Sequence, residues 1–408
     1  MKKKGNTSSQ FSFSRASGLM PQEEMLEIGR KHSKLVIGIP KDDRLIESRV
    51  ALTPEAVEIL VNEGHEIIIE SGAGNAANYK DTDYSENGGF IVEDKNQVYQ
   101  CDIILRITPL NSEEIDLLKG NQVIFSSLNL PQQDETCIRK LMQKNIIAIA
   151  FEYLRDEDNS FPVIRAMSEI AGTTSIFVAS EYLSKSRDGK GVMLGGVTGI
   201  TPTEIIILGA GTAAEYAARA AMGLGASIKV FDNSLIKLRR LQKHLNTRLY
   251  TSVFHPNVLK KDLSTADAVI GAAYQKHNTP HFLIDEDMVK QMKEGSVIVD
   301  LSIDQGGCVE TSEIRTIQNP SFVKHGIIHY CVPNIAARVG RTASIALSNV
   351  FSPLLLEMGE YGGIINFLKE KRGLRNGVYI YNGILTSNQI GERFGIPSRD
   401  IDLLMAAF

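Results

Sequence analysis

Residues 203–232 constrain the fold of this chain more than any other segment, because two apolar runs flank a glycine-rich turn there. Residues 204–208 are apolar after Glu204 and rich in β-branched side chains, which predicts a buried strand. The sequence Gly-Ala-Gly-Thr-Ala-Ala follows at residues 209–214 and leads into a helix-forming run. Residues 227–231 predict a second strand, which Asp232 ends. This order of strand, glycine turn, helix and strand is typical of a dinucleotide-binding Rossmann-like unit.

Four residues of this unit have a physical role in binding a dinucleotide. Gly209 allows the tight turn, Gly211 lets the backbone approach a pyrophosphate, and Ala214 keeps the helix close to the sheet. The helix N-terminus presents unpaired N–H groups to the phosphates. Asp232, about 20 residues beyond the turn, is placed to bind ribose hydroxyls and to repel a 2′-phosphate. We therefore expect NAD rather than NADP; the alternative is a sheet turn that needs glycine for its geometry alone.

The composition is that of an ordinary globular chain. Its 408 residues are enough for two or three domains, 43% of them are hydrophobic and 23% are charged. A net charge of -4 predicts neither nucleic-acid nor membrane-surface binding, and no apolar run is long enough to span a bilayer. The 4 cysteines are scattered without a Cys-x-x-Cys pair, so we expect reduced thiols, a cytoplasmic location and no metal site.

In the first part of the chain, hydrophobic patterns typical of helices alternate with short runs typical of strands. Two apolar helical patterns separate short strand-like runs, and this alternation indicates a parallel sheet with helices on its faces. The predicted helices are 111–118 and 134–144, and the predicted strands are 35–39, 65–70, 102–107, 122–128 and 146–151. A further helix is expected after Thr53, which resembles an N-cap and is followed by Pro54 at the first helical position.

The second part repeats the alternation after a long helix predicted for residues 167–184. Long helical patterns return near the end, where we expect the chain to cross back and complete the first domain. The predicted strands are 249–254, 268–272, 297–301 and 327–332, and the late helical patterns are 342–361 and 385–407. We expect an α/β fold with two Rossmann-like, doubly wound parallel-sheet domains, separated by a cleft and joined by long helices. The expected organisation is an N-terminal extension (1–33), a substrate domain (34–165 plus 340–408) and a nucleotide-binding domain (166–339).

Several motifs occur between residues 35 and 394 in an order that resembles the alanine dehydrogenase family. That family shares its fold with the nucleotide-binding subunit of proton-translocating transhydrogenase. The motifs are Ile39-Pro40, Glu47-Ser48-Arg49-Val50-Ala51-Leu52-Thr53-Pro54, Glu70-Ser71-Gly72-Ala73-Gly74, Met167-Ser168-Glu169-Ile170-Ala171-Gly172, the glycine turn, and Val299-Asp300-Leu301-Ser302-Ile303-Asp304-Gln305-Gly306-Gly307-Cys308. The resemblance implies reversible, NAD-dependent oxidative deamination of L-alanine to pyruvate and ammonia. It also implies a homo-oligomer, either a hexamer or a dimer.

The resemblance implies a role for three residues in the reaction. Arg49 would hold the substrate carboxylate by a bidentate pair; the alternative is a surface ion pair with Glu47. Asp304 would face the nicotinamide and the attacking water or ammonia; the alternative is a loop carboxylate that caps backbone N–H groups. Asn334 matches a family asparagine beside the reacting centre, and the alternative is an asparagine in a turn.

Four further residues match positions that contact the cofactor in this family. They are Ser168 on the predicted long helix, Lys237 after the second strand of the dinucleotide unit, Ile303 and Ile335. For Lys237 an exposed helix residue is an equally good interpretation.

Two positions depart from the family pattern. The family's substrate-binding lysine belongs to a Lys-x-Lys-Glu-Pro stretch, which here reads Arg106-Ile107-Thr108-Pro109, so that Thr108 replaces the lysine. The family's catalytic histidine follows a strand, and Asn129 stands in its place. Asparagine has a donor and an acceptor but no accessible pKa. Arg106, two residues before Thr108 on the predicted strand, faces the same side and is the candidate for the missing cation.

These departures leave two kinds of function open. One is an alanine dehydrogenase with an altered substrate pocket, in which Asp304, or less directly His277, acts on the proton. The other is an NAD-binding protein without dehydrogenase activity, such as a sensor, a scaffold or a transhydrogenase-like component. Turnover of a small amino acid or 2-oxo acid distinguishes them, because the second kind binds NAD(H) without oxidising any amino acid.

Overall fold

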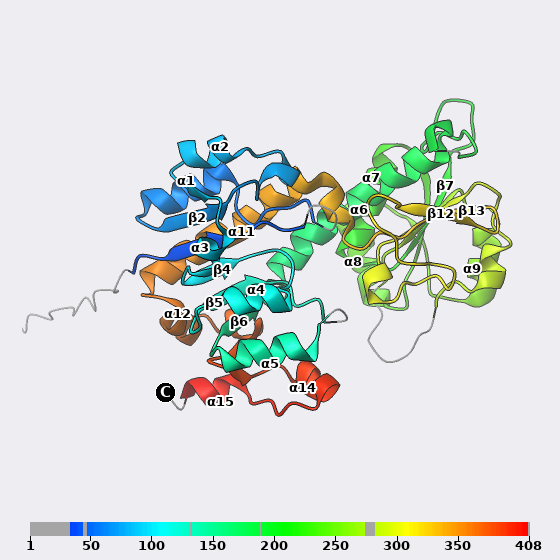
Figure 1. The fold of residues 1–408 in the computed structure, drawn as a ribbon. Helices are drawn as coiled ribbons and strands as arrows, with labels where there is room; N and C mark the ends of the chain where they lie inside the picture. Colours follow the sequence, from blue (N-terminus) through cyan, green and yellow to red (C-terminus); the bar gives the residue numbers. More distant parts are fainter. Residues whose placement is uncertain (1–32, 44–46, 131–132, 188, 274–281, 407–408) are drawn as a thin grey trace, which may run out of the picture.

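The computed structural model describes residues 33–43, 47–130, 133–187, 189–273 and 282–406. These residues form two lobes, each built around one sheet (Figure 1). The extension expected for residues 1–33 lies outside the described residues except for Ser33, and so does His277.

The sheet of the first lobe has 8 strands in the order β15-β14-β6-β5-β4-β1-β2-β3. The six strands from β6 to β3 run parallel, and β14 pairs antiparallel with β6. The strands are β1 Val36–Ile39, β2 Glu66–Glu70, β3 Phe90–Val92, β4 Ile103–Leu105, β5 Val123–Ser126, β6 Ile147–Ala150, β14 Val378–Tyr381 and β15 Ile384–Leu385. The helices are α1 Pro54–Asn62, α2 Asp81–Glu86, α3 Lys95–Tyr99, α4 Ser112–Leu117, α5 Glu135–Gln143, α12 Ile364–Glu370, α13 Arg372–Arg375, α14 Asn388–Phe394 and α15 Ile401–Ala406.

The sheet of the second lobe has 7 strands in the order β12-β13-β11-β10-β7-β8-β9. All are parallel except β12, which pairs antiparallel with β13. The strands are β7 Glu204–Leu208, β8 Ser227–Phe231, β9 Tyr250–Ser252, β10 Ala268–Gly271, β11 Val297–Asp300, β12 Ser321–Lys324 and β13 Ile327–Tyr330. The helices are α7 Thr212–Gly223, α8 Leu235–Leu245, α9 Pro256–Leu263 and α10 Glu286–Val289.

Helices cover both faces of each sheet, because alternate strand residues are buried on opposite sides. In β7, Ile205 and Ile207 pack into a core that includes residues of α6 and α7. Ile206 and Leu208 pack into a different core, which contains residues of α9 and α10. A strand that buries both faces has no polar positions, and this explains its continuous apolar sequence. The α/β class with two Rossmann-like sheets is thereby confirmed.

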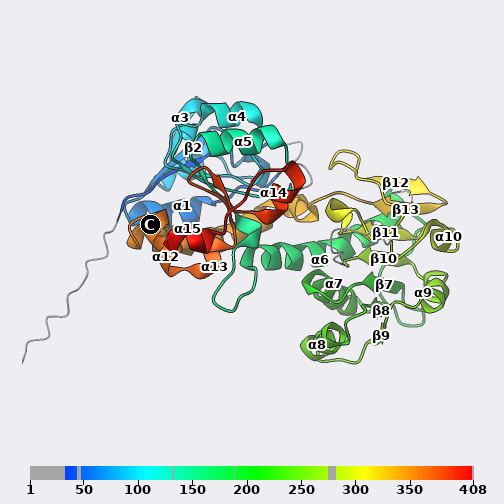
Figure 2. The same cartoon turned by 90° about the horizontal axis from the view of Figure 1, so that it is seen from below.

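Two long helices connect the lobes: α6 Pro162–Leu183, labelled in Figure 1 and Figure 2, and α11 Gly340–Glu360, labelled in Figure 1. Helix α6 continues into the second lobe and packs closely against α7. A Cβ at Gly172 would lie 2.1 Å from the carbonyl oxygen of Ala213, so this helix crossing requires glycine. After α11 the chain returns to the first lobe, where β14 and β15 join the edge of its sheet.

The helix expected over residues 385–407 is wrong as a single element. Leu385 belongs to β15, and the remainder divides into α14 and α15. Gly395 ends α14 with a φ of +65°, and Pro397 follows it. A hairpin that the periodicity did not reveal precedes these helices, with φ of +46° at Asn382 and +77° at Gly383. An Asn-Gly pair between apolar runs is a strong hairpin signal in a sequence.

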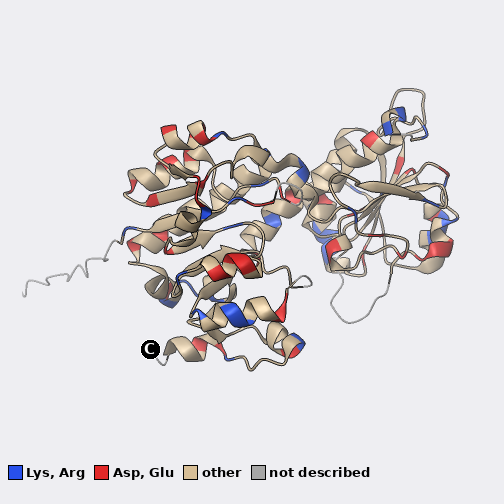
Figure 3. Ribbon diagram, viewed as in Figure 1, with Lys and Arg blue, Asp and Glu red and all other residues tan. Residues whose placement is uncertain are grey.

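Charged residues of both signs are distributed over both lobes (Figure 3). Among the described helices, none is long and apolar enough to cross a membrane.

Candidate active site

Several residues predicted to contact the cofactor or to take part in the reaction follow strands of the second sheet. Gly209 follows β7, Asp232 follows β8, Asp304 follows β11 and Asn334 follows β13. These strands are parallel neighbours on either side of β10, so their carboxyl ends lie along one edge of the sheet. Ligands of open α/β sheets bind at this edge.

The glycine turn adopts the geometry that a dinucleotide site requires. Gly209 has a φ of +102°, and a Cβ there would lie 2.5 Å from the carbonyl oxygen of Ala272 at the end of β10. Gly211 precedes α7, and no atom lies within 4 Å of the position that its Cβ would take. Ala214 is fully buried in the first turn of α7. The turn is therefore closed against the sheet at Gly209 and open on the side of Gly211.

The carboxylate of Asp232 organises this turn. Its Oδ2 accepts a hydrogen bond of 2.8 Å from the backbone N–H of Ala210, and its Oδ1 accepts one of 2.7 Å from that of Ser234. Each oxygen keeps a second lone pair. Asp232 thus fixes the loop conformation and retains acceptor capacity for further donors.

The other predicted cofactor contacts come from three elements. Ser168 is half-buried on α6, whereas Lys237 is exposed on α8. Ile303 lies in the 3₁₀ turn η5 Ile303–Gln305, and Ile335 begins η6 Ile335–Val339; both are buried. The side chains of Ser168 and Lys237 are thus accessible, whereas those of Ile303 and Ile335 are not.

Arg49 and Glu47 form a bidentate ion pair, and both residues lie away from the surface. The Nε of Arg49 is 2.7 Å from Oε1 of Glu47, and Nη2 is 2.7 Å from Oε2. Only 11% of the Arg49 side chain and 2% of the Glu47 side chain are exposed. The pair that was the alternative interpretation of Arg49 exists, but it is buried rather than superficial.

The same pair joins the two lobes. Asn334, which has a φ of +58°, donates from Nδ2 to Oε2 of Glu47 over 3.1 Å. The Nη1 of Arg49 lies 3.3 Å from the sulfur of Met167 on α6. The sequence indicated the pairing of Glu47 with Arg49, but not the contact of Glu47 with Asn334, which lies 287 positions further along the chain.

Arg106 and Thr108 lie together, but Arg106 is already engaged. Strand β4 ends at Leu105, so both residues lie on the loop after it, with Nε of Arg106 3.1 Å from Oγ1 of Thr108. The Nε of Arg106 is also 2.8 Å from Oδ1 of Asp42, and Nη1 pairs with Glu114. Thr108 donates a hydrogen bond to Asp42. Burial raises the pKa of Asp42, and the Arg106 guanidinium opposes this shift.

Asn129 sits beside a buried carboxyl group that the sequence did not single out. Glu152, in η3 Phe151–Tyr153 after β6, accepts a 2.7 Å hydrogen bond at Oε1 from the backbone N–H of Leu128 and a longer one from that of Asn129. Burial raises the pKa of Glu152. Its position after a strand next to β5 was the available signal, because the carboxyl ends of adjacent parallel strands share one edge.

Two carboxylates near the end of β11 have different environments. Asp300 ends the strand, is 1% exposed, and accepts hydrogen bonds from the backbone N–H groups of Ser302 and Cys308 and from the hydroxyl of Ser312. Asp300 therefore caps backbone N–H groups of this turn, and the N–H groups of Asp304 and Gln305 lie close to the Asp304 carboxylate as well. Asp304 follows in η5 and is exposed, yet nearby protein desolvates its carboxyl and raises its pKa to about 6, and Asp300 adds to this shift.

Comparisons with known proteins agree with this geometry over most of the chain. Residues 38–171 match the family Alanine dehydrogenase/PNT, N-terminal domain, and residues 175–388 match Alanine dehydrogenase/PNT, C-terminal domain. An alanine dehydrogenase from Staphylococcus saprophyticus subsp. saprophyticus is 35% identical over 369 residues, which cover 90% of this chain and 99% of that protein.

Solved structures show the same relationship. An L-alanine dehydrogenase superposes with a TM-score of 0.82 at 31% identity, and the match covers 88% of this chain and 99% of that one. A transhydrogenase from Sinorhizobium meliloti has a TM-score of 0.73 at 20% identity, covers 87% of this chain and 99% of its own, and shows the fold alone. The two domain matches cover one lobe each, and the relative and the solved structure span both lobes. This chain therefore belongs to the alanine dehydrogenase/PNT family.

Proposed function

We propose that this protein is an NAD-dependent dehydrogenase that oxidises L-alanine to pyruvate and ammonia where the two lobes meet. The observation that carries the proposal is the contact of Asn334 with the Glu47–Arg49 pair, with Nδ2 of Asn334 3.1 Å from Oε2 of Glu47. It brings a cation of the first lobe to the edge of the second sheet at which a dinucleotide would bind. The membership of the family and the named alanine dehydrogenase relatives support the reaction.

The residues of the second lobe fit NAD. The open side of Gly211 and the N–H groups that begin α7 would hold the pyrophosphate, and Asp232 has lone pairs for ribose hydroxyls. Ser168, Lys237, Ile303 and Ile335 would complete the contacts from the surrounding elements. NAD, when bound, supplies the acceptor for the hydride of alanine.

Arg49 would orient the substrate through its carboxylate. Glu47 occupies the guanidinium edge formed by Nε and Nη2, which leaves the Nη1–Nη2 edge, beside Met167, for a second bidentate pair. Because Glu47 fixes the guanidinium plane, this edge is oriented before alanine arrives. Asn334, held by the same carboxylate, would lie beside the reacting carbon.

Asp304 would act as the general base that accepts the proton of the attacking water. Oxidation of the C–N unit gives an iminium carbon, water adds to that carbon, and a base must take the proton from the attacking water. A carboxylate with a pKa of about 6 is ionised near neutral pH and basic enough for this step. The amide of Asn129 does not ionise near neutral pH, so Asn129 would orient the substrate or water by hydrogen bonding.

Several features of the organisation belong to the same proposal. The division into a substrate domain (34–165 plus 340–408) and a nucleotide domain (166–339) is supported by the two sheets and by the return of β14 to the first. We also infer a cytoplasmic homo-oligomer, a hexamer or a dimer, as in the family that the sequence resembles.

One observation favours a second function, that of an NAD-binding protein without turnover. Arg106, the candidate replacement for the family's lysine, already pairs with Asp42 and Glu114, so its charge is neutralised within the first lobe. Steady-state production of NADH with L-alanine, followed by a panel of other amino acids, tests the two functions. Turnover with alanine supports the dehydrogenase, whereas NAD binding by calorimetry without turnover of any amino acid contradicts it.

A further inference from the structure

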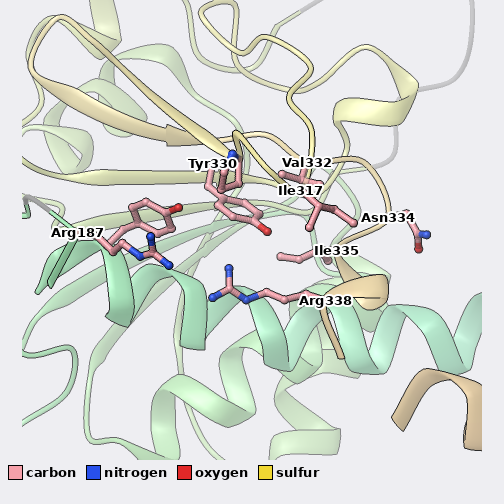
Figure 4. A pocket seen from close by; sticks show the side chains of 9 residues that line it. Arg187, Ile317, Tyr330, Val332, Asn334, Ile335 and Arg338 are labelled. Carbon is pink, nitrogen blue, oxygen red and sulfur yellow. The ribbon is translucent and has the colours of Figure 1, made fainter. Parts of the chain in front are cut away.

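A cavity of about 310 Å³ lies next to the candidate active site, between the end of α6, the carboxyl end of β13 and η6 (Figure 4). The guanidinium groups of Arg187 and Arg338 lie on one side of it. Asn334 forms its far end, and its side chain is directed away from the arginines, toward Glu47. The cavity is thus a neighbour of the proposed substrate site and has its own charged groups.

The two arginines give the cavity a positive charge. Both pair with the same carboxylate: Nε of Arg187 lies 2.7 Å from Oε1 of Glu181, and Arg338 pairs with Oε2. Within the described residues, Glu181 is the one carboxylate that contacts either guanidinium. Two cations with one shared anion leave an excess of one positive charge and several unused N–H donors.

Each of these arginines lies near a tyrosine ring. The Cζ of Arg187 lies 5.9 Å from the ring centroid of Tyr182, and the Cζ of Arg338 lies 5.9 Å from that of Tyr330. The two rings are themselves 5.7 Å apart. Each guanidinium therefore lies within reach of an aromatic ring as well as of Glu181, which limits the conformations that it can adopt.

The opposite wall is apolar. Ile317, Val332 and Ile335 lie between the arginines and Asn334 in Figure 4, and Pro320 also lines the cavity. A volume of about 310 Å³ is at the small end of the range for metabolite pockets. A ligand would place its charged group at the arginines and its carbon skeleton against this wall.

We propose that this cavity is a binding site for a small organic anion with carboxylate or phosphate groups, distinct from the substrate site at Arg49. Guanidinium groups bind both kinds of anion by paired N–H donors. Its charged groups, Arg187, Arg338 and Glu181, have no part in the proposed reaction, although Asn334 and Ile335 at its border are assigned to the substrate and the cofactor.

Calorimetry on the full chain without NAD or amino acid tests this proposal, with malonate as the dicarboxylate probe and inorganic phosphate as the phosphate probe. We expect one anion to bind per chain. Arg187→Gln and Arg338→Gln should each weaken binding at least about tenfold, as expected for the loss of one charge-assisted hydrogen bond. Tighter binding of malonate assigns the site to carboxylates, and tighter binding of phosphate assigns it to phosphate compounds.

Two further variants make the result specific. Arg219→Gln is the matched control, because Arg219 also pairs with a glutamate, Glu215 at 3.0 Å, and lies 5.8 Å from a tyrosine ring, but does not line the cavity. Arg49→Ala removes the proposed substrate cation and should leave anion binding intact. Thermal unfolding confirms that each variant folds, and Arg187, 54% exposed, is the safer of the two substitutions. Absence of binding, equal binding by the Arg187→Gln and wild-type chains, or loss of binding in Arg49→Ala alone overturns the proposal.

Discussion

At the scale of single residues, the environment separates groups that the sequence presents as equivalent. Asp300 and Asp304 lie four positions apart, but the first is buried among N–H and O–H donors and the second is exposed in the turn η5. Arg49 and Arg106 are both candidate cations. Arg49 has one guanidinium edge, beside Met167, that no carboxylate among the described residues occupies, whereas the N–H groups of Arg106 already contact Asp42, Glu114 and other groups of the first lobe. Their partners, rather than their identity, decide which of them can act on a substrate.

The pKa of Asp304 predicts the pH dependence of turnover. A base works only when ionised, and desolvation by nearby protein raises the pKa of Asp304 above the ordinary aspartate value to about 6. We therefore expect kcat, measured with saturating NAD and alanine, to rise as the pH rises through about 6. Asp304→Asn should lower kcat by about 10²- to 10⁴-fold, the contribution of a general base. Asp287→Asn, at an exposed position of α10, is the control and should leave kcat unchanged. A wild-type kcat that does not change with pH near pH 6 would contradict the role of Asp304 as the base.

The replaced positions predict a gain of function. Thr108→Lys would restore a cation next to Asp42, which now accepts a hydrogen bond from Thr108, and Asn129→His would restore a group that exchanges protons near neutral pH. Both changes together should raise kcat/KM for alanine more than the product of the two single effects, because one positions the carboxylate and the other moves the proton. Thr108→Met, similar in length but uncharged, should give no gain. A double variant no faster than wild type would show that these positions do not have the family roles.

At the scale of elements, the two glycines of the turn have different roles, because Gly209 is needed for stability and Gly211 for NAD binding. Gly209→Ala should lower the free energy of unfolding by at least about 1 kcal/mol, because its φ of +102° is unfavourable for alanine and the new Cβ would meet the Ala272 carbonyl. Gly211→Val should leave stability almost unchanged, since its Cβ position is open, but should abolish NAD binding. Urea unfolding and calorimetry measure the two effects. Retained NAD binding by Gly211→Val would place the pyrophosphate elsewhere.

The sequence was most informative where one rule determines an element. Strand β7 buries both faces and is apolar from Ile205 to Leu208, so its position was predictable from residues 204–208. Arg106 and Thr108 were expected on a strand, but β4 ends at Leu105, because strand ends depend on pairing that no local pattern reports. The hairpin at Asn382 was missed although its turn residues are typical, since β15 has too few residues to show a period.

The candidate site was predictable in part for a similar reason. A motif gives residues in one stretch, such as Gly209 and Gly211, and their local geometry follows from it. The contacts of Glu47 with Asn334 and of Glu152 with Leu128 join residues far apart in the chain. Only the relative placement of strands and lobes brings such residues together, and one sequence contains no direct record of it.

At the scale of the whole molecule, the two lobes divide the ligands between them. The nucleotide edge lies in the second lobe, and Arg49 belongs to the first, so Arg49→Ala should weaken alanine binding and leave NAD affinity unchanged. The loss of one charge-assisted bidentate contact should cost about 1.5–3 kcal/mol, read from kcat/KM. Arg139→Ala is the control, because Arg139 forms an exposed pair with Glu135 on α5. A comparable loss of NAD affinity in Arg49→Ala would show that the ligands are not divided in this way.

The transfer of hydrogen from C2 of alanine to NAD tests the central claim most directly. The full chain is incubated with NAD and L-alanine deuterated at C2, and the nucleotide is then analysed by mass spectrometry. The proposed reaction predicts deuterium in the NADH formed, in amounts equal to the pyruvate released, and no label in a parallel incubation of Gly211→Val. Unlabelled nucleotide from a chain that binds NAD would contradict the dehydrogenase and support an NAD-binding protein without turnover.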